Sequence, residues 1–153
     1  DTFNLGSKIF KILFNTAYQI TYISGENKAM FNLKNTKHKI YSHKKNIRKT
    51  IKNNDLVICG EGLIKYDAIY CNKPMFLVHQ FDRKTNLIKK FLNNNVCESY
   101  KSKEINSHFK KHLFRYIANK QLIKKHLNNQ YLRFIKKNKK IEFTKLINEI
   151  KKL

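Results

Sequence analysis

A short glycine-containing segment holds the residues best suited to bind a phosphate. Gly60, Glu61 and Gly62 directly follow a hydrophobic run. Lys65 and Asp67 come next, on a segment with helical spacing. Glycine lets the backbone bend sharply and approach a ligand closely, and N–H groups at the start of a helix attract anions. Lys65 would add a positive charge and Asp67 would accept hydrogen bonds from sugar hydroxyls, so the spacing favours binding of a diphosphate that carries a sugar.

The same segment has a simpler structural explanation, because two glycines can serve only to make a tight turn from strand to helix. Other candidate site residues stand at the ends of other expected strands. Gly25 follows QITYIS, and His79 and Gln80 stand at the end of MFLVH. A place in the core explains His79 as well as ligand contact does. Asn86 lies in the next helical turn, where capping of the helix is favoured over contact with a sugar.

The cysteines and histidines do not form a metal-binding pattern. Cys59, Cys71 and Cys97 lack Cys-x-x-Cys spacing. His108 and His112 are four residues apart, with no cysteine or acidic residue beside them in the sequence. An odd number of cysteines in this arrangement is typical of free thiols in a reducing compartment. We therefore expect no metal, no cofactor and no disulfide, and a cytoplasmic location.

The elements that must position these residues alternate along the first hundred positions. Strands are expected at 19–24, 39–42, 55–59, 75–79 and 96–99. Helices are expected at 5–14, 28–34, 43–53 (with Ser42 as N-cap), 63–71 and 85–93. Strands separated by helical segments predict βαβ units, and hence a Rossmann-like α/β fold whose parallel sheet has helices on both faces. Ligands bind such sheets at the carboxyl ends of the strands, where Gly60 and His79 stand.

The strands stop near residue 101, and the tail is expected to be helical. Helical spacing covers 103–125 and 131–153, with polar gaps at 128–129 and 136–140. We expect a single domain over 1–153. It would have an α/β core over 1–100, and two or three C-terminal helices over 101–153 that pack back on the sheet.

The large positive charge has two explanations. The 153 residues include 33 Lys and Arg against 10 Asp and Glu, a net charge of +23. The 29 Lys, 19 Asn and 18 Ile are typical of drift in an AT-rich genome. The functional alternative is a surface that binds the phosphates of nucleic acid or of anionic lipid. With only 4 Arg, which make forked contacts to phosphates and guanines, nucleic acid is the less favoured partner.

The tail is the most basic part of the chain. Residues 101–153 hold 16 Lys and Arg against 3 Asp and Glu, a net charge of +13. This charge predicts contact with an anionic surface, such as the inner face of a membrane. The sequence has no apolar run long enough to span a membrane, and its first residues do not resemble a secretory signal.

The segment 55–80, DLVICGEGLIKYDAIYCNKPMFLVHQ, resembles the C-terminal half of GT-B glycosyltransferases and their relatives. The shared pattern is an acid-led strand, a glycine-rich turn, a helix with a tyrosine and an acid (Tyr66 and Asp67), then Lys-Pro and a second strand. It is most similar to the group that contains the UDP-sugar hydrolase of pseudaminic acid synthesis and the spore-coat polysaccharide proteins. DTFNL at the start and QITYISG at 19–25 also resemble segments of this group, so the likeness covers residues 1–100.

The resemblance implies the nucleotide-sugar-binding half of a glycosyltransferase in cell-surface polysaccharide or glycan biosynthesis. A UDP-sugar would bind at the turn from Gly60 to Leu63, and the acceptor would be a glycan or a lipid-linked precursor. The catalytic residues would belong to an N-terminal half, which with a first strand would precede this chain, so no catalytic residue is assigned. Glu61 stands where the family has a second glycine. The alternatives are a nucleotide-sugar hydrolase, a domain that has lost activity, and a non-enzymatic module that binds nucleic acid.

Overall fold

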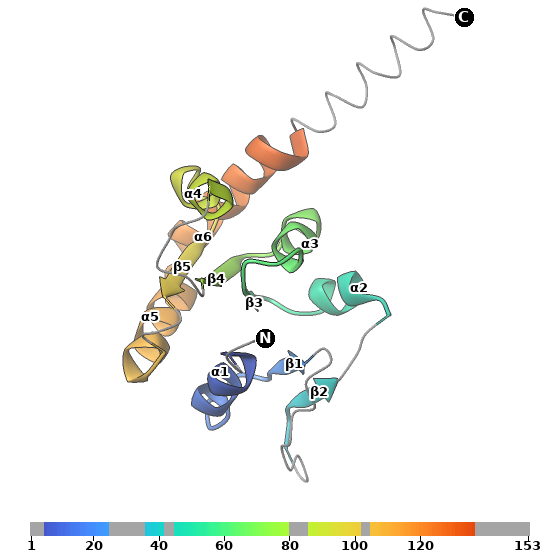
Figure 1. The fold of residues 1–153 in the computed structure, drawn as a ribbon, viewed down its shortest axis with the longest axis vertical. Coiled ribbons are helices and arrows are strands. Elements are labelled where there is room, and N and C mark those ends of the chain that lie inside the picture. The colour runs from blue at the N-terminus through green and yellow to red at the C-terminus, as the bar shows by residue number, and fades with distance from the viewer. Residues whose placement is uncertain (1–4, 25–35, 42–44, 80–85, 102–104, 137–153) are drawn as a thin grey trace, which may run out of the picture.

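The computed structural model describes residues 5–24, 36–41, 45–79, 86–101 and 105–136 (Figure 1). In chain order its elements are α1 (Leu5–Leu13), β1 (Thr21–Ile23), β2 (Lys39–Tyr41), α2 (Ile47–Lys52), β3 (Val57–Cys59), α3 (Ile64–Tyr70), β4 (Met75–His79), α4 (Asn86–Asn93), β5 (Glu98–Lys101), α5 (Ser107–Ala118), α6 (Lys120–Gln130) and the π-helix η2 (Tyr131–Lys136). Helices flank a small parallel sheet, which confirms the predicted α/β class. The expected helix at 28–34 lies outside the described residues.

The central sheet has three parallel strands in the order β3-β4-β5. Val57 lies opposite Met75, and Phe76 lies opposite Glu98. In the described part of the chain, β1 and β2 form a separate parallel pair and are not hydrogen-bonded to β3. The sequence predicted one parallel sheet, so the division into two sheets is a correction.

Strand β4 separates two hydrophobic cores, because alternate side chains of a strand point to opposite faces. Met75 and Leu77 pack with residues of α2, α3 and α4, among them Phe91. Phe76 and Val78 pack with residues of α1 and α5. Figure 1 shows α3 and α5 on opposite sides of β4. All five residues of β4 are buried, so the continuous apolar run did indicate a strand covered on both faces.

Several element boundaries differ from the sequence prediction, and at two of them a side chain or the backbone caps a helix. Helix α2 begins at Ile47 rather than 43, since Asn46 caps it by accepting the N–H of Lys49 at 3.0 Å. The predicted cap, Ser42, lies outside the described residues. Strand β5 begins at 98 rather than 96, because the Val96 N–H donates to Phe91 in the turn that ends α4.

The C-terminal helices wrap around the β5 edge of the sheet from one face to the other. Helix α5 joins the core with α1, whereas Phe134 and Ile135 of η2 pack on the core with α3. Between them, Gln130 at the end of α6 donates to the Val96 carbonyl at 2.8 Å. This arrangement agrees with the expectation that the tail packs back on the sheet.

The breaks between the tail helices lie elsewhere than predicted. Helix α5 ends and α6 begins at Asn119, whose side chain accepts the N–H of Leu122 and caps α6. The predicted gap at 128–129 lies inside α6, and the predicted helix over 103–125 is two helices. Residues 137–153 lie outside the described part. Within the described residues, no helix has the length and apolar character needed to cross a membrane.

Candidate functional site

The turn from Gly60 to Leu63 joins the carboxyl end of β3 to α3, as the sequence predicted. Packing does not explain either glycine. A Cβ on Gly60 would make an ordinary contact, 3.8 Å from the Val78 carbonyl oxygen, and one on Gly62 would meet nothing within 4 Å. Neither residue has the left-handed backbone that favours glycine. By contrast, a Cβ on Gly6 would lie 2.7 Å from the Tyr22 ring, so packing does require that glycine.

Lys65 holds the turn from its inner side. The residue is only 2% exposed, and its Nζ donates to the carbonyl oxygens of Glu61 and, at 2.9 Å, of Gly62. The ammonium also lies 4.8 Å from the centre of the Tyr66 ring. Burial lowers the pKa of Lys65, while Cys59 and Glu61 act in the opposite direction. The sequence analysis expected this charge to face a bound phosphate. In the structure the ammonium instead binds the turn's own carbonyl groups.

The contacts of Lys65 orient the peptide groups of the turn. In a planar trans peptide the C=O and the N–H point in opposite directions. The carbonyls of Glu61 and Gly62 point toward Lys65, so the N–H groups of Gly62 and Leu63 point away from it. Both of these residues are exposed, Leu63 to 79%. The turn therefore directs successive N–H groups outward, an arrangement that attracts anions.

His79 ends β4 next to this turn. Cys59 lies opposite Leu77 in the parallel register, so the next residue, Gly60, reaches the same edge of the sheet as His79. The ring is 5% exposed, and its Nδ1 has no hydrogen-bond partner among the described residues. Alternation along β4 places His79 on the same face as Leu77, which is the face that α3 covers. A buried nitrogen without a partner costs roughly 1–3 kcal/mol, which a ligand acceptor or donor would recover.

Asp67 faces α2 instead of the turn. Its Oδ1 accepts a hydrogen bond of 2.7 Å from the Nε of Arg48, and the side chain is 19% exposed. This bond raises the pKa of Arg48. The carboxylate, expected to contact a sugar, is thus held in an ion pair that the sequence analysis did not foresee. The sequence does show opposite charges on two consecutive helices, Arg48 and Asp67. Only the packing of α2 on α3 shows that they meet.

The other predicted site residues are placed as follows. Tyr66 is 39% exposed, and its ring packs edge-on against Phe91 at 5.6 Å between centroids. Asn86 is the first residue of α4, but its side chain lies outside the described part. Gly25 and Gln80 also lie outside the described residues.

Among the described residues, the histidines and thiols form no reactive cluster. The Nε2 of His112 donates to the Oε1 of Glu98 in β5 at 3.1 Å, and sequence spacing did not reveal this acidic neighbour. Burial raises the pKa of Cys59 and of Cys97 to about 12, so neither thiol supplies a thiolate at neutral pH. Throughout the described ranges, no group of three His, Cys, Asp or Glu residues is arranged to hold a metal ion.

Comparison with known proteins assigns no family to this chain. No protein-family model matches it, and no curated protein or solved structure matches it either. The site therefore has to be interpreted from its own residues and geometry.

Proposed function

We propose that the α/β core is the nucleotide-sugar-binding half of a GT-B-like glycosyltransferase in cell-surface polysaccharide or glycan biosynthesis. The outward N–H groups of Gly62 and Leu63, held by the contacts of Lys65 with the turn carbonyls, carry this proposal. Two glycines that packing does not require leave room for a ligand to approach the backbone. The unpartnered nitrogen of His79 supplies a further polar group at the same edge.

In this function the turn would bind the diphosphate of a UDP-sugar. N–H groups fixed in advance stabilise the negative charge that grows on the departing nucleotide diphosphate. The acceptor, a glycan or a lipid-linked precursor, and the catalytic residues would come from another part of the enzyme. With water in place of the acceptor, the same site would serve a nucleotide-sugar hydrolase.

The basic tail suggests where this enzyme works. Lys120, Lys124 and Lys125 are exposed on α6, whereas His126 and Gln130 of the same helix are buried. We propose that the exposed lysines hold the protein at an anionic inner membrane face, where lipid-linked acceptors are found. The cytoplasmic location follows from this proposal and from the free thiols.

Titration calorimetry with UDP and a UDP-sugar tests the nucleotide site. We expect saturable binding to the wild-type chain and, for Lys65→Met, a roughly tenfold loss of affinity because the turn is no longer held from inside. Lys8→Gln, which removes an exposed lysine of α1, is the control for charge and should bind like the wild type. If the folded wild-type chain binds no nucleotide diphosphate or nucleotide sugar, the proposal is wrong.

A further inference from the structure

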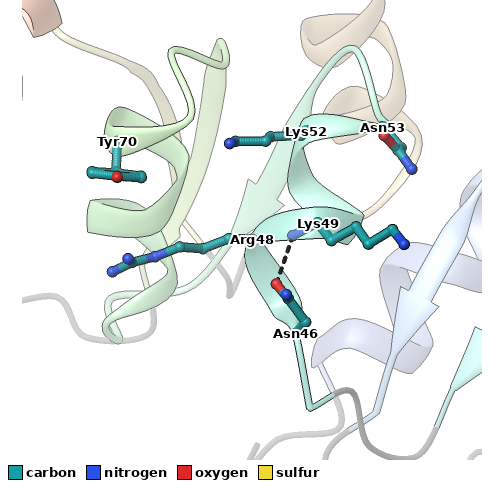
Figure 2. Close-up of a pocket in the computed structure, with 6 residues that line it drawn as sticks. All are labelled: Asn46, Arg48, Lys49, Lys52, Asn53 and Tyr70. Atoms are coloured by element: carbon teal, nitrogen blue, oxygen red, sulfur yellow. Dashed lines mark hydrogen bonds between the residues drawn. The ribbon is translucent and has the colours of Figure 1, made fainter.

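A basic pocket lies between α2 and α3, outside the site described above. It is open, with a volume of about 410 Å³, and is lined by Asn46, Arg48, Lys49, Lys52, Asn53 and Tyr70. Tyr70 is the last residue of α3, whereas the turn precedes the first residue of that helix. Figure 2 shows Arg48 and Lys52 extending from α2 toward α3, and Lys49 and Asn53 extending to the other side.

The guanidinium of Arg48 is fixed in position by two contacts. Its Nε donates to Asp67, and its central carbon lies 4.5 Å from the centre of the Tyr70 ring. Neither contact uses the two terminal NH₂ groups, which have no partner among the described residues. An arginine held in this way keeps a planar pair of donors that matches two oxygens of a phosphate or carboxylate.

The charge of the pocket favours an anion. The ammonium groups of Lys49 and Lys52 also have no partner in the described part of the chain, and both residues are exposed. Arg48 and Lys52 are the two cations that extend toward α3. Arg48 is paired with Asp67, so Lys52 supplies the positive charge that remains on that side. Positive charges gathered in a concave surface raise the local concentration of anions.

We propose that this pocket binds the phosphate group of a small phosphate ester, at a site separate from the turn at Gly60–Leu63. The terminal NH₂ groups of Arg48 bind two phosphate oxygens, and Lys52 contributes a point charge from the same side. A pocket of about 410 Å³ has the size of sites for ligands such as mononucleotides or sugar phosphates. The exposed ring of Tyr70 provides an apolar surface for the organic part of the ester.

A titration of the full chain with phenyl phosphate at low salt, followed by ¹H–¹⁵N NMR, tests this site. We expect saturable shifts of the backbone signals of Arg48, Lys52 and Tyr70. Lys52→Gln leaves the pair between Arg48 and Asp67 intact and should weaken binding roughly tenfold, the effect of one charge-assisted contact. Arg48→Lys keeps the charge but removes the planar donor pair, and should weaken binding by a similar factor.

Lys8→Gln is the matched control, since it removes the same charge from an exposed position on α1. It should bind phenyl phosphate like the wild type, and circular dichroism shows whether each variant is folded. The proposal is overturned if the control loses as much affinity as Lys52→Gln, or if the shifts do not saturate. It is also overturned if the shifts are confined to Gly62 and Leu63, because the ester then binds at the turn.

Discussion

At the scale of single residues, the buried lysine at position 65 has the greatest consequence. A lysine head group taken out of water needs strong acceptors, and the carbonyl oxygens of Glu61 and Gly62 supply them. The same contacts turn the opposite ends of those peptide groups outward. One side chain therefore stabilises the turn and also sets which of its polar groups a ligand would meet.

Glu61 offers a test of what the turn binds. If a diphosphate lies against the turn, the Glu61 carboxylate repels it, so Glu61→Gly should tighten binding of UDP. Two like charges about 4 Å apart in water repel by about 1 kcal/mol, which corresponds to a roughly fivefold gain in affinity. Calorimetric titration of the wild type and of Glu61→Gly with UDP and with a UDP-sugar measures this gain in affinity. Unchanged affinity for both ligands would remove Glu61 from the site, and weaker binding of the UDP-sugar alone would indicate that Glu61 contacts the sugar.

At the scale of elements, the packing of α5 on α6 buries a titratable pair. His126 is 3% exposed, and its Nδ1 lies 3.2 Å from the hydroxyl of Tyr116. Burial lowers the pKa of His126 from 6.5, and Lys125 acts in the same direction, whereas Glu98 opposes the change. Burial likewise raises the pKa of Tyr116, so the pair is neutral over the physiological range.

This pair predicts how stability changes with pH. Because the folded-state pKa of His126 is below 6.5, the unfolded chain binds more protons as the pH falls under that value. The free energy of unfolding should then fall with decreasing pH, by at most about 1.4 kcal/mol per pH unit from this residue. Urea unfolding of the wild type and of His126→Gln between about pH 5 and pH 7.5 measures the contribution.

The control for this measurement is His108→Gln, which changes an exposed histidine of α5. Its free energy of unfolding should depend on pH in the same way as that of the wild type. A His126→Gln variant with the same pH dependence as the wild type would show that His126 titrates alike in the folded and unfolded chains.

At the scale of the whole molecule, the exposed lysines of α6 allow a test of the proposed contact with an anionic surface. The apolar side chains of the tail helices pack against the sheet, whereas the lysines 120, 124 and 125 of α6 are exposed. The alternative, compositional drift, predicts no preference for anionic lipid. The two explanations can be separated because only the first requires that binding depend on these lysines.

Flotation with liposomes distinguishes contact with an anionic surface from compositional drift. We expect the chain to bind vesicles that contain anionic lipid at low salt and to be released at high salt, because salt screens exposed charges. Replacement of Lys120, Lys124 and Lys125 by Gln should weaken binding roughly a hundredfold, since each lysine near the surface contributes about 1 kcal/mol. Equal binding to neutral vesicles, or no binding at low salt, would favour compositional drift.

The sequence alone determined the elements whose pattern is local. The apolar run 75–79 indicated a strand buried on both faces, and the step from strand to glycine turn to helix at 57–70 was predicted close to its observed position. These predictions hold because the period of apolar residues, and the polar break that ends it, act over a few neighbouring positions. The meeting of Gly60 and His79 at one edge followed in the same way, from the parallel direction of adjacent strands.

The tertiary structure alone decided the features that depend on residues far apart in the sequence. Arg48 forms an ion pair with Asp67 because α2 packs on α3. Glu98 forms a hydrogen bond with His112 because α5 lies across β5. Lys65 turns inward because the packing around α3 buries it, although a lysine early in a helix usually extends into water. Such partners are set by the packing of whole elements, which brings together polar groups that lie far apart in the sequence.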